Sequence, residues 1–228
     1  MIGHGPESSG SVVSVNVGSP REIEWRGRIV RTSIYKSPVN GAVRVGRLNL
    51  EGDQQSDLSV HGGVHKAVYT YPSEHYPWWR LELDDPDLDW GAFGENLTVS
   101  GLTETSVRIG DRFQIGTAEL LVTQPRLPCY KLGIRFGRPD METRFLRSGR
   151  TGFYFSVIRE GELEAGDAVA IVARAEDSMT VAEIVALYQA ERPDADVVRR
   201  AGELAALPLG MREHFRRRLH APGARTDG

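Results

Sequence analysis

The strongest constraint on this chain is a series of short β-branched or alternating apolar runs, separated by Gly, Pro and Asn, between Ser11 and about Val172. Such runs are typical of strands, because alternate side chains of a strand point to opposite faces. Many short strands joined by turns predict a closed or nearly closed β-barrel. The runs predict strands at residues 11–17, 29–35, 66–71, 96–101, 118–124, 153–159 and 168–172.

Turns and helices interrupt these strands at predictable places. The dipeptide Gly116-Thr117 separates the runs RFQI and AELLV, which predicts a hairpin with a two-residue turn. Residues 72–83 and 137–149 carry helical patterns. Pro77 falls inside the first of these, and we expect it to shorten that helix.

After Ala173 the periodicity changes from strand to helix. Three short amphipathic helices are expected at 180–192, 195–206 and 210–220, parted by Pro193 and Pro208. So short a bundle cannot bury much apolar surface alone, and we expect it to pack on the barrel or on a partner. At the start of the first helix, Thr180 and Glu183 have the spacing of a capping box.

The predicted organisation is therefore mainly β, and α+β overall. We expect a disordered N-terminus over residues 1–10, which are rich in Gly and Ser, and a barrel domain over 11–175. A three-helix domain over 178–220 and a disordered tail over 221–228 complete the expectation.

Charge and cysteine content exclude several classes of protein. The single cysteine, Cys129, rules out an internal disulfide and a four-thiolate metal site. The net charge of −3 argues against nucleic-acid binding, and no apolar run is long enough to span a membrane. The first ten residues lack the features of an export signal, so a soluble cytoplasmic protein is expected.

The chain has lysine only at positions 36, 66 and 131; a GC-rich coding sequence is the simplest explanation for that scarcity.

The segment 53–76 contains two histidines around a Gly-Gly pair. The metalloprotease motif needs a helix with a Glu between its histidines, whereas Gly62 and Gly63 disfavour a helix. Adjacent glycines allow backbone N–H groups to converge on an anion, and His61, His65 and Lys66 could reinforce such a site. A Gly-rich turn without any ligand explains the same residues equally well.

Two further segments combine polar residues with strand boundaries. Glu95 and Asn96 precede a strand, where polar pairs commonly stabilise turns. Cys129 follows another strand, with Arg126 and Lys131 close to it in sequence. Nearby cations stabilise a thiolate, which binds metals and attacks electrophiles. A buried, unreactive cysteine is the alternative interpretation.

Together these segments resemble the MOSC domain family, named for the C-terminal part of molybdenum cofactor sulfurases. The resemblance is strongest to its stand-alone bacterial YiiM-like branch, and it runs from about residue 29 to 173. The helices at 180–220 resemble the three-helix domain that follows in that branch. The motifs that carry the resemblance are VHGGVHKAVYTYPSEHY, FGENLTVSGLTE, VRIGDRFQIGTAELLVTQPRLPCYKLG and TGFYFSVIREGELEAGDAV.

The resemblance implies a molybdenum pyranopterin cofactor whose metal is coordinated by Cys129. It also implies reduction of N-hydroxylated compounds, such as hydroxylamino purines, to amines. On this basis we expect Asn96 and Glu95 near the reacting centre together with Cys129. The cofactor would be held by His61, Gly62, Gly63, His65, Lys66, Arg126 and Lys131. The sequence shows no flavin, haem or iron–sulfur motif, and one cysteine cannot hold an iron–sulfur cluster, so electrons are expected from a separate donor protein. The expected oligomeric state is a monomer or a homodimer.

Other functions use the same residues. Cys129 could carry a persulfide or pass on the cofactor without redox chemistry, as a sulfur carrier would. A cysteine hydrolase that pairs Cys129 with His61 or His65 is a weaker alternative. Lys66 or Lys131 could in principle form a Schiff base with pyridoxal phosphate, but nothing else in the chain resembles such an enzyme. The aromatic residues between Tyr69 and Trp79 either pack in the hydrophobic core or stack on the purine ring of a substrate.

Overall fold

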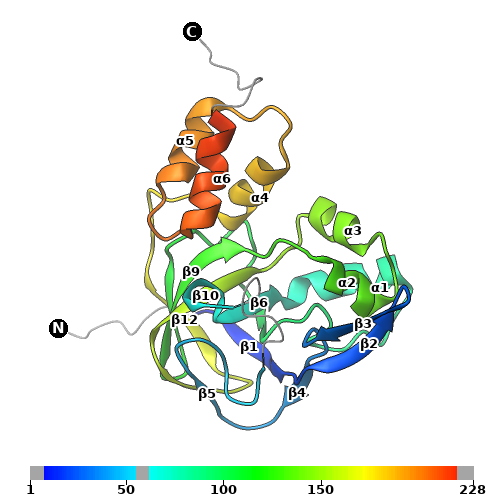
Figure 1. Cartoon of the computed structure of the whole chain (residues 1–228). Coiled ribbons are helices and arrows are strands. Elements are labelled where there is room, and N and C mark those ends of the chain that lie inside the picture. Colours follow the sequence, from blue (N-terminus) through cyan, green and yellow to red (C-terminus); the bar gives the residue numbers. More distant parts are fainter. Residues whose placement is uncertain (1–7, 55–61, 220–228) are drawn as a thin grey trace, which may run out of the picture.

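The computed structural model describes residues 8–54 and 62–219, and its centre is a closed barrel (Figure 1). Strand β1 (Ser8–Val17) pairs with β7 on one side and with β12 on the other, which closes the sheet. All neighbours are antiparallel except β6 and β7, which run parallel. The order around the barrel is β1, β12 (Ala168–Ala173), β8 (Arg112–Ile115), β9 (Ala118–Pro125), β10 (Phe153–Arg159), β6 (Val68–Pro72) and β7 (Leu97–Ser100).

Each predicted strand region contains an observed strand, so the mainly β architecture is confirmed. The predicted hairpin is also present: Ile115 of β8 faces Ala118 of β9 across the two-residue turn. Gly116 adopts φ +55°, and a Cβ there would lie 2.2 Å from the Glu162 carbonyl oxygen, so glycine is required. The short strands that the sequence patterns did not predict are β2 (Arg21–Trp25), β4 (Ser37–Val39), β5 (Val43–Val45) and β11 (Gly161–Leu163).

The expectation of disorder over residues 1–10 is wrong for Ser8, Ser9 and Gly10, which belong to β1. Their backbone pairs with β12, with Ser8 opposite Ala170. A Cβ on Gly10 would lie 1.8 Å from the Ser100 carbonyl oxygen, so the strand approaches β7 more closely than a side chain would allow. Residues 1–7 and the expected tail at 221–228 lie outside the described residues.

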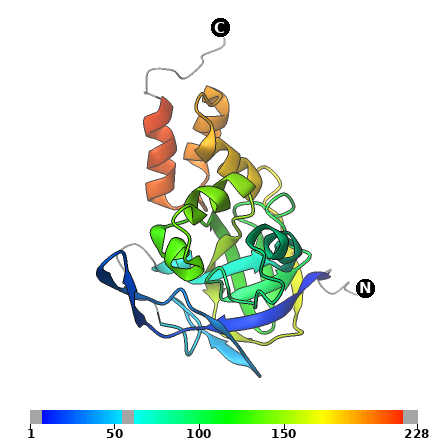
Figure 2. The ribbon, with the colours of Figure 1, turned by 90° about the vertical axis from the view of Figure 1, so that its right-hand side faces the viewer.

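Helices and a hairpin surround the barrel. Strands β2 and β3 (Arg28–Thr32) form a separate hairpin that projects from the barrel (Figure 2). Helix α1 (Tyr76–Leu83) begins one residue before Pro77, so this proline starts the helix instead of interrupting it. Helix α3 (Met141–Ser148) matches the second predicted helix, whereas α2 (Tyr130–Phe136) lies in a segment interpreted as a loop.

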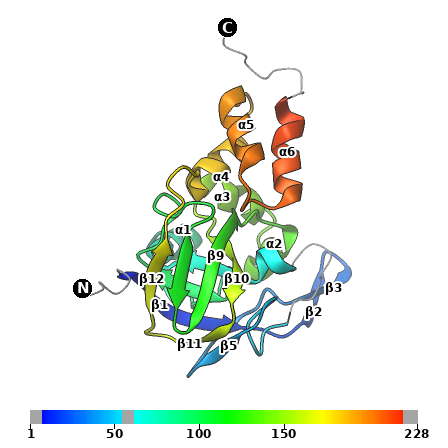
Figure 3. The ribbon, with the colours of Figure 1, turned by 90° about the vertical axis from the view of Figure 1, so that its left-hand side faces the viewer.

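The three C-terminal helices are α4 (Val181–Gln189), α5 (Ala195–Glu203) and α6 (Leu209–Leu219), and they stack at one end of the barrel (Figures 1 and 3). The predicted capping box is present, since Thr180 and Glu183 each bind the other's backbone N–H. One hydrophobic cluster includes both barrel residues and Ile184, Val198 and Phe215 of these helices. None of the helices described here has the length and apolar character needed to cross a membrane.

Candidate functional site

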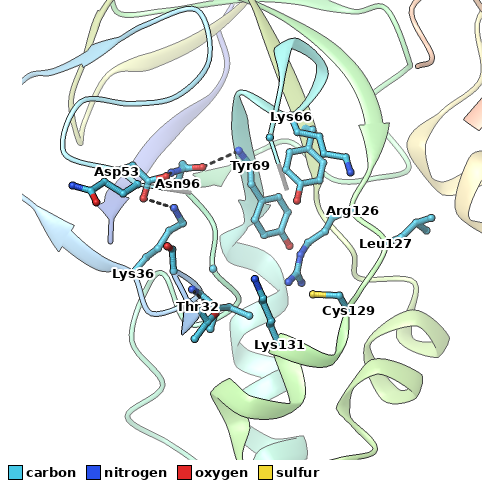
Figure 4. A pocket seen from close by; sticks show the side chains of 16 residues that line it. Thr32, Lys36, Asp53, Lys66, Tyr69, Asn96, Arg126, Leu127, Cys129 and Lys131 are labelled. Carbon is cyan, nitrogen blue, oxygen red and sulfur yellow. Dashed lines mark hydrogen bonds and ion pairs between the residues drawn. The ribbon is translucent and has the colours of Figure 1, made fainter. Parts of the chain in front are cut away.

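A pocket of about 680 Å³, including the part open to solvent, lies between the barrel and the segments that cover it. This volume suits a small organic ligand. The lining comes from distant parts of the sequence, and its side chains face a common space (Figure 4). It comprises Thr32, Ser33, Ile34, Lys36, Asp53, Gln54, Gly62, Lys66, Tyr69, Gly94, Asn96, Arg126, Leu127, Cys129, Lys131 and Tyr154.

At one end of the pocket the Cys129 thiol lies close to Arg126 and Lys131 (Figure 4). Cys129 ends the extended connection from β9, with φ −134° and ψ 167°, and helix α2 begins directly after it. Lys66 enters from the other wall, and its pKa is lowered by burial, although negative charge on Cys129 opposes that shift. The sole thiol of the chain is therefore surrounded by cations, as the sequence predicted for Arg126 and Lys131.

Arg126 is the most confined of these cations, with 6% of its surface exposed. Its guanidinium lies 4.9 Å from the centre of the Tyr69 ring and 5.1 Å from that of Phe145. Burial lowers its pKa, but Tyr69, Tyr154 and Cys129 outweigh that effect and the pKa is raised. Within the described residues, Nη1 of Arg126 is buried without a hydrogen-bond partner. A buried donor without a partner is costly, so this atom points to a ligand with acceptor oxygens.

The opposite end of the pocket contains a buried ion pair between Lys36 and Asp53 (Figure 4). Asp53 also accepts hydrogen bonds from the backbone N–H of Gly18, at 2.9 Å, and from the side-chain amide of Asn96, at 2.9 Å. Burial lowers the pKa of Lys36, and the attraction of Asp53 offsets part of that shift. Asp53 is thus held by several donors, and the ion pair forms a fixed part of the wall.

All three lysines of the chain, at positions 36, 66 and 131, line this one pocket. A bias of the coding sequence toward arginine explains why lysine is rare, but it does not explain why the lysines converge. Among the described residues of the lining, the three lysines and Arg126 give four cations against the single carboxylate of Asp53. The excess of positive charge favours an anionic ligand.

Glu95 and Asn96 are neighbours in sequence with different surroundings. Glu95 is fully buried and is absent from the pocket lining, contrary to the expectation of a place at the reacting centre. Its carboxylate accepts hydrogen bonds from the Tyr76 hydroxyl, the Thr98 hydroxyl and two backbone N–H groups of the 91–93 loop. Burial raises its pKa, and these hydrogen bonds oppose that rise. Glu95 therefore fixes the loop before β7.

Asn96 does line the pocket, but its amide already has protein partners. Its Oδ1 accepts from the backbone N–H of Tyr69 at 3.1 Å, and its Nδ2 donates to Asp53. These contacts link β6, β7 and the loop that carries Asp53. The position of Asn96 suits a residue that orients the pocket wall.

The segment around Gly62 and Gly63 was expected to hold the cofactor, and only part of it lies at the pocket. Gly62 and Lys66 line the pocket, whereas Gly63 and His65 do not. His65 is exposed, and its carbonyl oxygen accepts a hydrogen bond from the Thr123 hydroxyl at 2.7 Å. His61 lies outside the described residues.

Sequence reasoning missed Lys36, Asp53 and Tyr154, which all line the pocket. For Lys36 the signal was the rarity of lysine, which became informative only when the three lysines were seen to meet; Asp53 and Tyr154 carried no such signal. Of the aromatic stretch, Tyr69 lines the pocket, while Tyr71, Tyr76 and Trp79 are buried in a second hydrophobic cluster.

Among the described residues, no group of three or more His, Cys, Asp or Glu side chains could hold a metal ion. A metal here would depend on the Cys129 thiolate and on ligands that a cofactor brings.

The chain belongs to the MOSC domain family. The MOSC domain matches residues 57–170, and the YiiM-like three-helix domain matches residues 179–221. It is 42% identical to YflK of Bacillus subtilis over 90% of this chain and 92% of that protein. The crystal structure of YiiM from Geobacillus stearothermophilus, 37% identical, superposes with a TM-score of 0.78 over 92% of this chain and 99% of that one.

A fungal relative carries a name that refers to activity. A protein of Gibberella moniliformis named reductase is 33% identical over 88% of this chain, which corresponds to 35% of that longer protein.

Proposed function

We propose that this protein binds a molybdenum pyranopterin cofactor in the pocket and reduces N-hydroxylated compounds to amines. The observation that carries the proposal is the position of the only thiol of the chain. It opens into a cation-lined pocket beside Nη1 of Arg126, which has no hydrogen-bond partner among the residues that the structure describes. MOSC domains are associated with this cofactor, and the relative named reductase supports redox chemistry.

The residues present fit such a group. Cys129 would supply a soft thiolate to the metal, and the dithiolene of the cofactor would supply the remaining sulfur ligands. Lys66, Arg126 and Lys131 would hold its anionic groups, because they carry the positive charge and the donors that a phosphate requires. When bound, the cofactor supplies the two-electron chemistry that removes oxygen from the N–OH group.

The side chains of the pocket orient the reactants and hold protons. The overall reaction consumes two electrons and two protons, breaks the N–O bond and yields an amine and water. Burial raises the pKa of Tyr154, although Arg126 opposes the rise, so its hydroxyl keeps its proton and can donate a hydrogen bond inside the pocket. Lys36 and Asp53 fix the far wall, and Asn96 holds Asp53 in place. The electrons come from a separate donor protein.

Metal analysis combined with an N-hydroxy reduction assay tests the proposal. The protein should be made in a host that synthesises the cofactor, and wild type should be compared with Cys129→Ser. We expect stoichiometric molybdenum and reduction of a hydroxylamino purine in wild type, and loss of both in the variant. Tyr130→Phe is a matched control, because it changes the adjacent residue, whose side chain does not line the pocket.

The alternative outcomes are distinct. A metal-free wild-type protein that carries labile sulfur on Cys129 would contradict the proposal and support a persulfide carrier. A Cys129→Ser variant that keeps both its molybdenum and its activity would show that the thiolate is not a ligand.

A further inference from the structure

Glu104 is a buried carboxylate that does not line the pocket. It lies in the connection between β7 and β8, and only 4% of its surface is exposed. Its Oε1 accepts a hydrogen bond from the backbone N–H of Gly152 at 2.6 Å, and its Oε2 lies 2.7 Å from Nε2 of His75. A buried carboxylate is costly unless its oxygens are bound. Here both oxygens have partners, which fix the carboxylate in one orientation.

The backbone of Glu104 is anchored as well. Its carbonyl oxygen accepts a hydrogen bond, at 2.9 Å, from the backbone N–H of Ala182 in the first turn of α4. In the same connection, the Val107 carbonyl oxygen accepts a hydrogen bond from the backbone N–H of Val181 at 2.9 Å. The C-terminal helices therefore hold the segment that carries Glu104.

The residues that Glu104 holds contact Arg126 in two ways. The Gly152 carbonyl oxygen accepts a hydrogen bond from the backbone N–H of Arg126 at 3.2 Å. The Thr151 carbonyl oxygen accepts one from the Tyr69 hydroxyl at 2.8 Å. The ring of Tyr69 in turn lies against the Arg126 guanidinium (Figure 4). The backbone and the side chain of Arg126 thus both depend on these two residues.

Residues 151 and 152, which we call the 151–152 segment, are buried and packed closely against β6. Gly152 adopts φ +62°, and a Cβ there would lie 2.4 Å from the Thr70 carbonyl oxygen. Without Glu104 the buried N–H of Gly152 would lose its acceptor, and the segment would have to move to find another. Such a movement would shift Arg126, because the two are joined by a hydrogen bond.

We propose that Glu104 is a positioning residue of the anion site, because it holds the 151–152 segment and so places Arg126 where Nη1 can bind an oxyanion. The proposal rests on the proposed function in one respect, which is that Arg126 binds the anionic part of the cofactor. Charge and position have opposite effects here. By charge alone, removal of a carboxylate strengthens the binding of a nearby anion. A loss of anion affinity after its removal therefore identifies positioning.

Binding of inorganic phosphate to the cofactor-free protein, measured by isothermal titration calorimetry, tests the proposal. Glu104→Ala removes the acceptor for Gly152, and we expect the phosphate affinity to fall about tenfold, which is the equivalent of one net hydrogen bond. Glu104→Gln removes the charge but keeps an acceptor oxygen, so its affinity should equal or exceed that of wild type. Glu104→Asp keeps the charge on a shorter side chain, and its affinity should fall; it also serves if Glu104→Ala does not fold.

Asp111→Ala is the matched control for stability. Asp111 is also a buried carboxylate that accepts backbone N–H hydrogen bonds, from Arg108 and Ala175, and it does not line the pocket. Its replacement should lower the free energy of unfolding, as that of Glu104 does, and leave the phosphate affinity unchanged.

The Nε–H resonance of Arg126 in NMR spectra, assigned by its absence in Arg126→Lys, provides a second readout. The rings of Tyr69 and Phe145 lie over this guanidinium and shift its resonance. Glu104→Ala should move the resonance, and Asp111→Ala should not.

The proposal would be overturned if Glu104→Ala bound phosphate as tightly as wild type with an unmoved Arg126 resonance. An equal loss of affinity in Glu104→Gln or in Asp111→Ala would overturn it as well. A wild-type protein that binds no phosphate contradicts both this proposal and the assignment of Arg126 to the cofactor. If wild type binds phosphate and the variants behave as expected, but neither molybdenum nor N-hydroxy reduction is found, the proposed function fails and the positioning role of Glu104 stands.

Discussion

Glu95 and Asn96 illustrate how adjacent residues acquire different tasks. They precede β7, where successive side chains point to opposite sides. Glu95 faces the aromatic cluster that contains Tyr76, and Asn96 faces the pocket. The sequence identified both as polar residues at a strand entry, but it could not distinguish which side each would face.

This arrangement predicts a stability role for Glu95. Glu95→Gln replaces one acceptor oxygen by an NH₂ group, so at least one of the donors now bound by the carboxylate loses its partner. We expect a loss of about 1–3 kcal/mol in the free energy of unfolding, measured by urea denaturation. Unchanged stability together with lost reductase activity would restore a catalytic role for Glu95.

Lys66 predicts a pH dependence of ligand binding. Its pKa is below the ordinary lysine value of 10.5 because burial disfavours the charged form. As the pH rises through that lowered pKa, Lys66 loses its charge and its attraction for an anion. We expect the affinity for inorganic phosphate to fall with rising pH below 10.5, and the Lys66→Arg variant to keep its affinity to higher pH.

The pKa of Lys36 is lowered in the same direction, so the Lys66→Arg variant isolates the contribution of Lys66. If the phosphate affinity of wild type and that of Lys66→Arg fell in the same way at alkaline pH, Lys66 would not contact the anion.

At the scale of elements, helix α2 shows where local patterns are weak. It spans only Tyr130–Phe136, and its N-cap residue, Cys129, makes no side-chain capping hydrogen bond. Two prolines before it favour a loop interpretation. The helix forms because Leu132 is buried in the aromatic cluster, a contact that a local sequence window does not contain. Packing rather than propensity therefore determines this element.

Helix α4 has the opposite character, because its start is encoded locally. The Thr180 hydroxyl accepts from the backbone N–H of Glu183 at 3.1 Å, and Glu183 accepts from the backbone N–H of Thr180 at 2.6 Å. We expect Thr180→Ala to lower the free energy of unfolding by about 0.5–2 kcal/mol, measured by chemical denaturation. Thr180→Ser, which keeps the hydroxyl, is the control, and an equal loss in both variants would contradict the capping argument.

At the scale of the molecule, the barrel and the C-terminal helices share one hydrophobic cluster. Backbone hydrogen bonds join them as well, from Val181 to the Val107 carbonyl and from Ala182 to the Glu104 carbonyl. These contacts predict that the two parts unfold together.

Phe215 of α6 provides the test, because it is fully buried in this cluster. We expect Phe215→Ala to lower the free energy of unfolding by about 3–5 kcal/mol. All tryptophans precede residue 91 and belong to the barrel part of the chain, so their fluorescence reports on the barrel alone. The variant should shift the fluorescence transition and the helical circular dichroism transition equally. A fluorescence midpoint that stays at the wild-type value would show that the helices unfold independently.

The sequence by itself determined the features that depend on neighbours along the chain. Strand alternation, the turn at Gly116, the capping box at Thr180 and the closeness of Arg126 and Lys131 to Cys129 are all encoded within a few residues. Only the tertiary structure decided that Lys36 and Lys66 meet Lys131 in one pocket and that Glu95 lies outside it. The physical reason is that these positions are brought together by long-range strand pairing, which closes the barrel when β1 binds both β7 and β12.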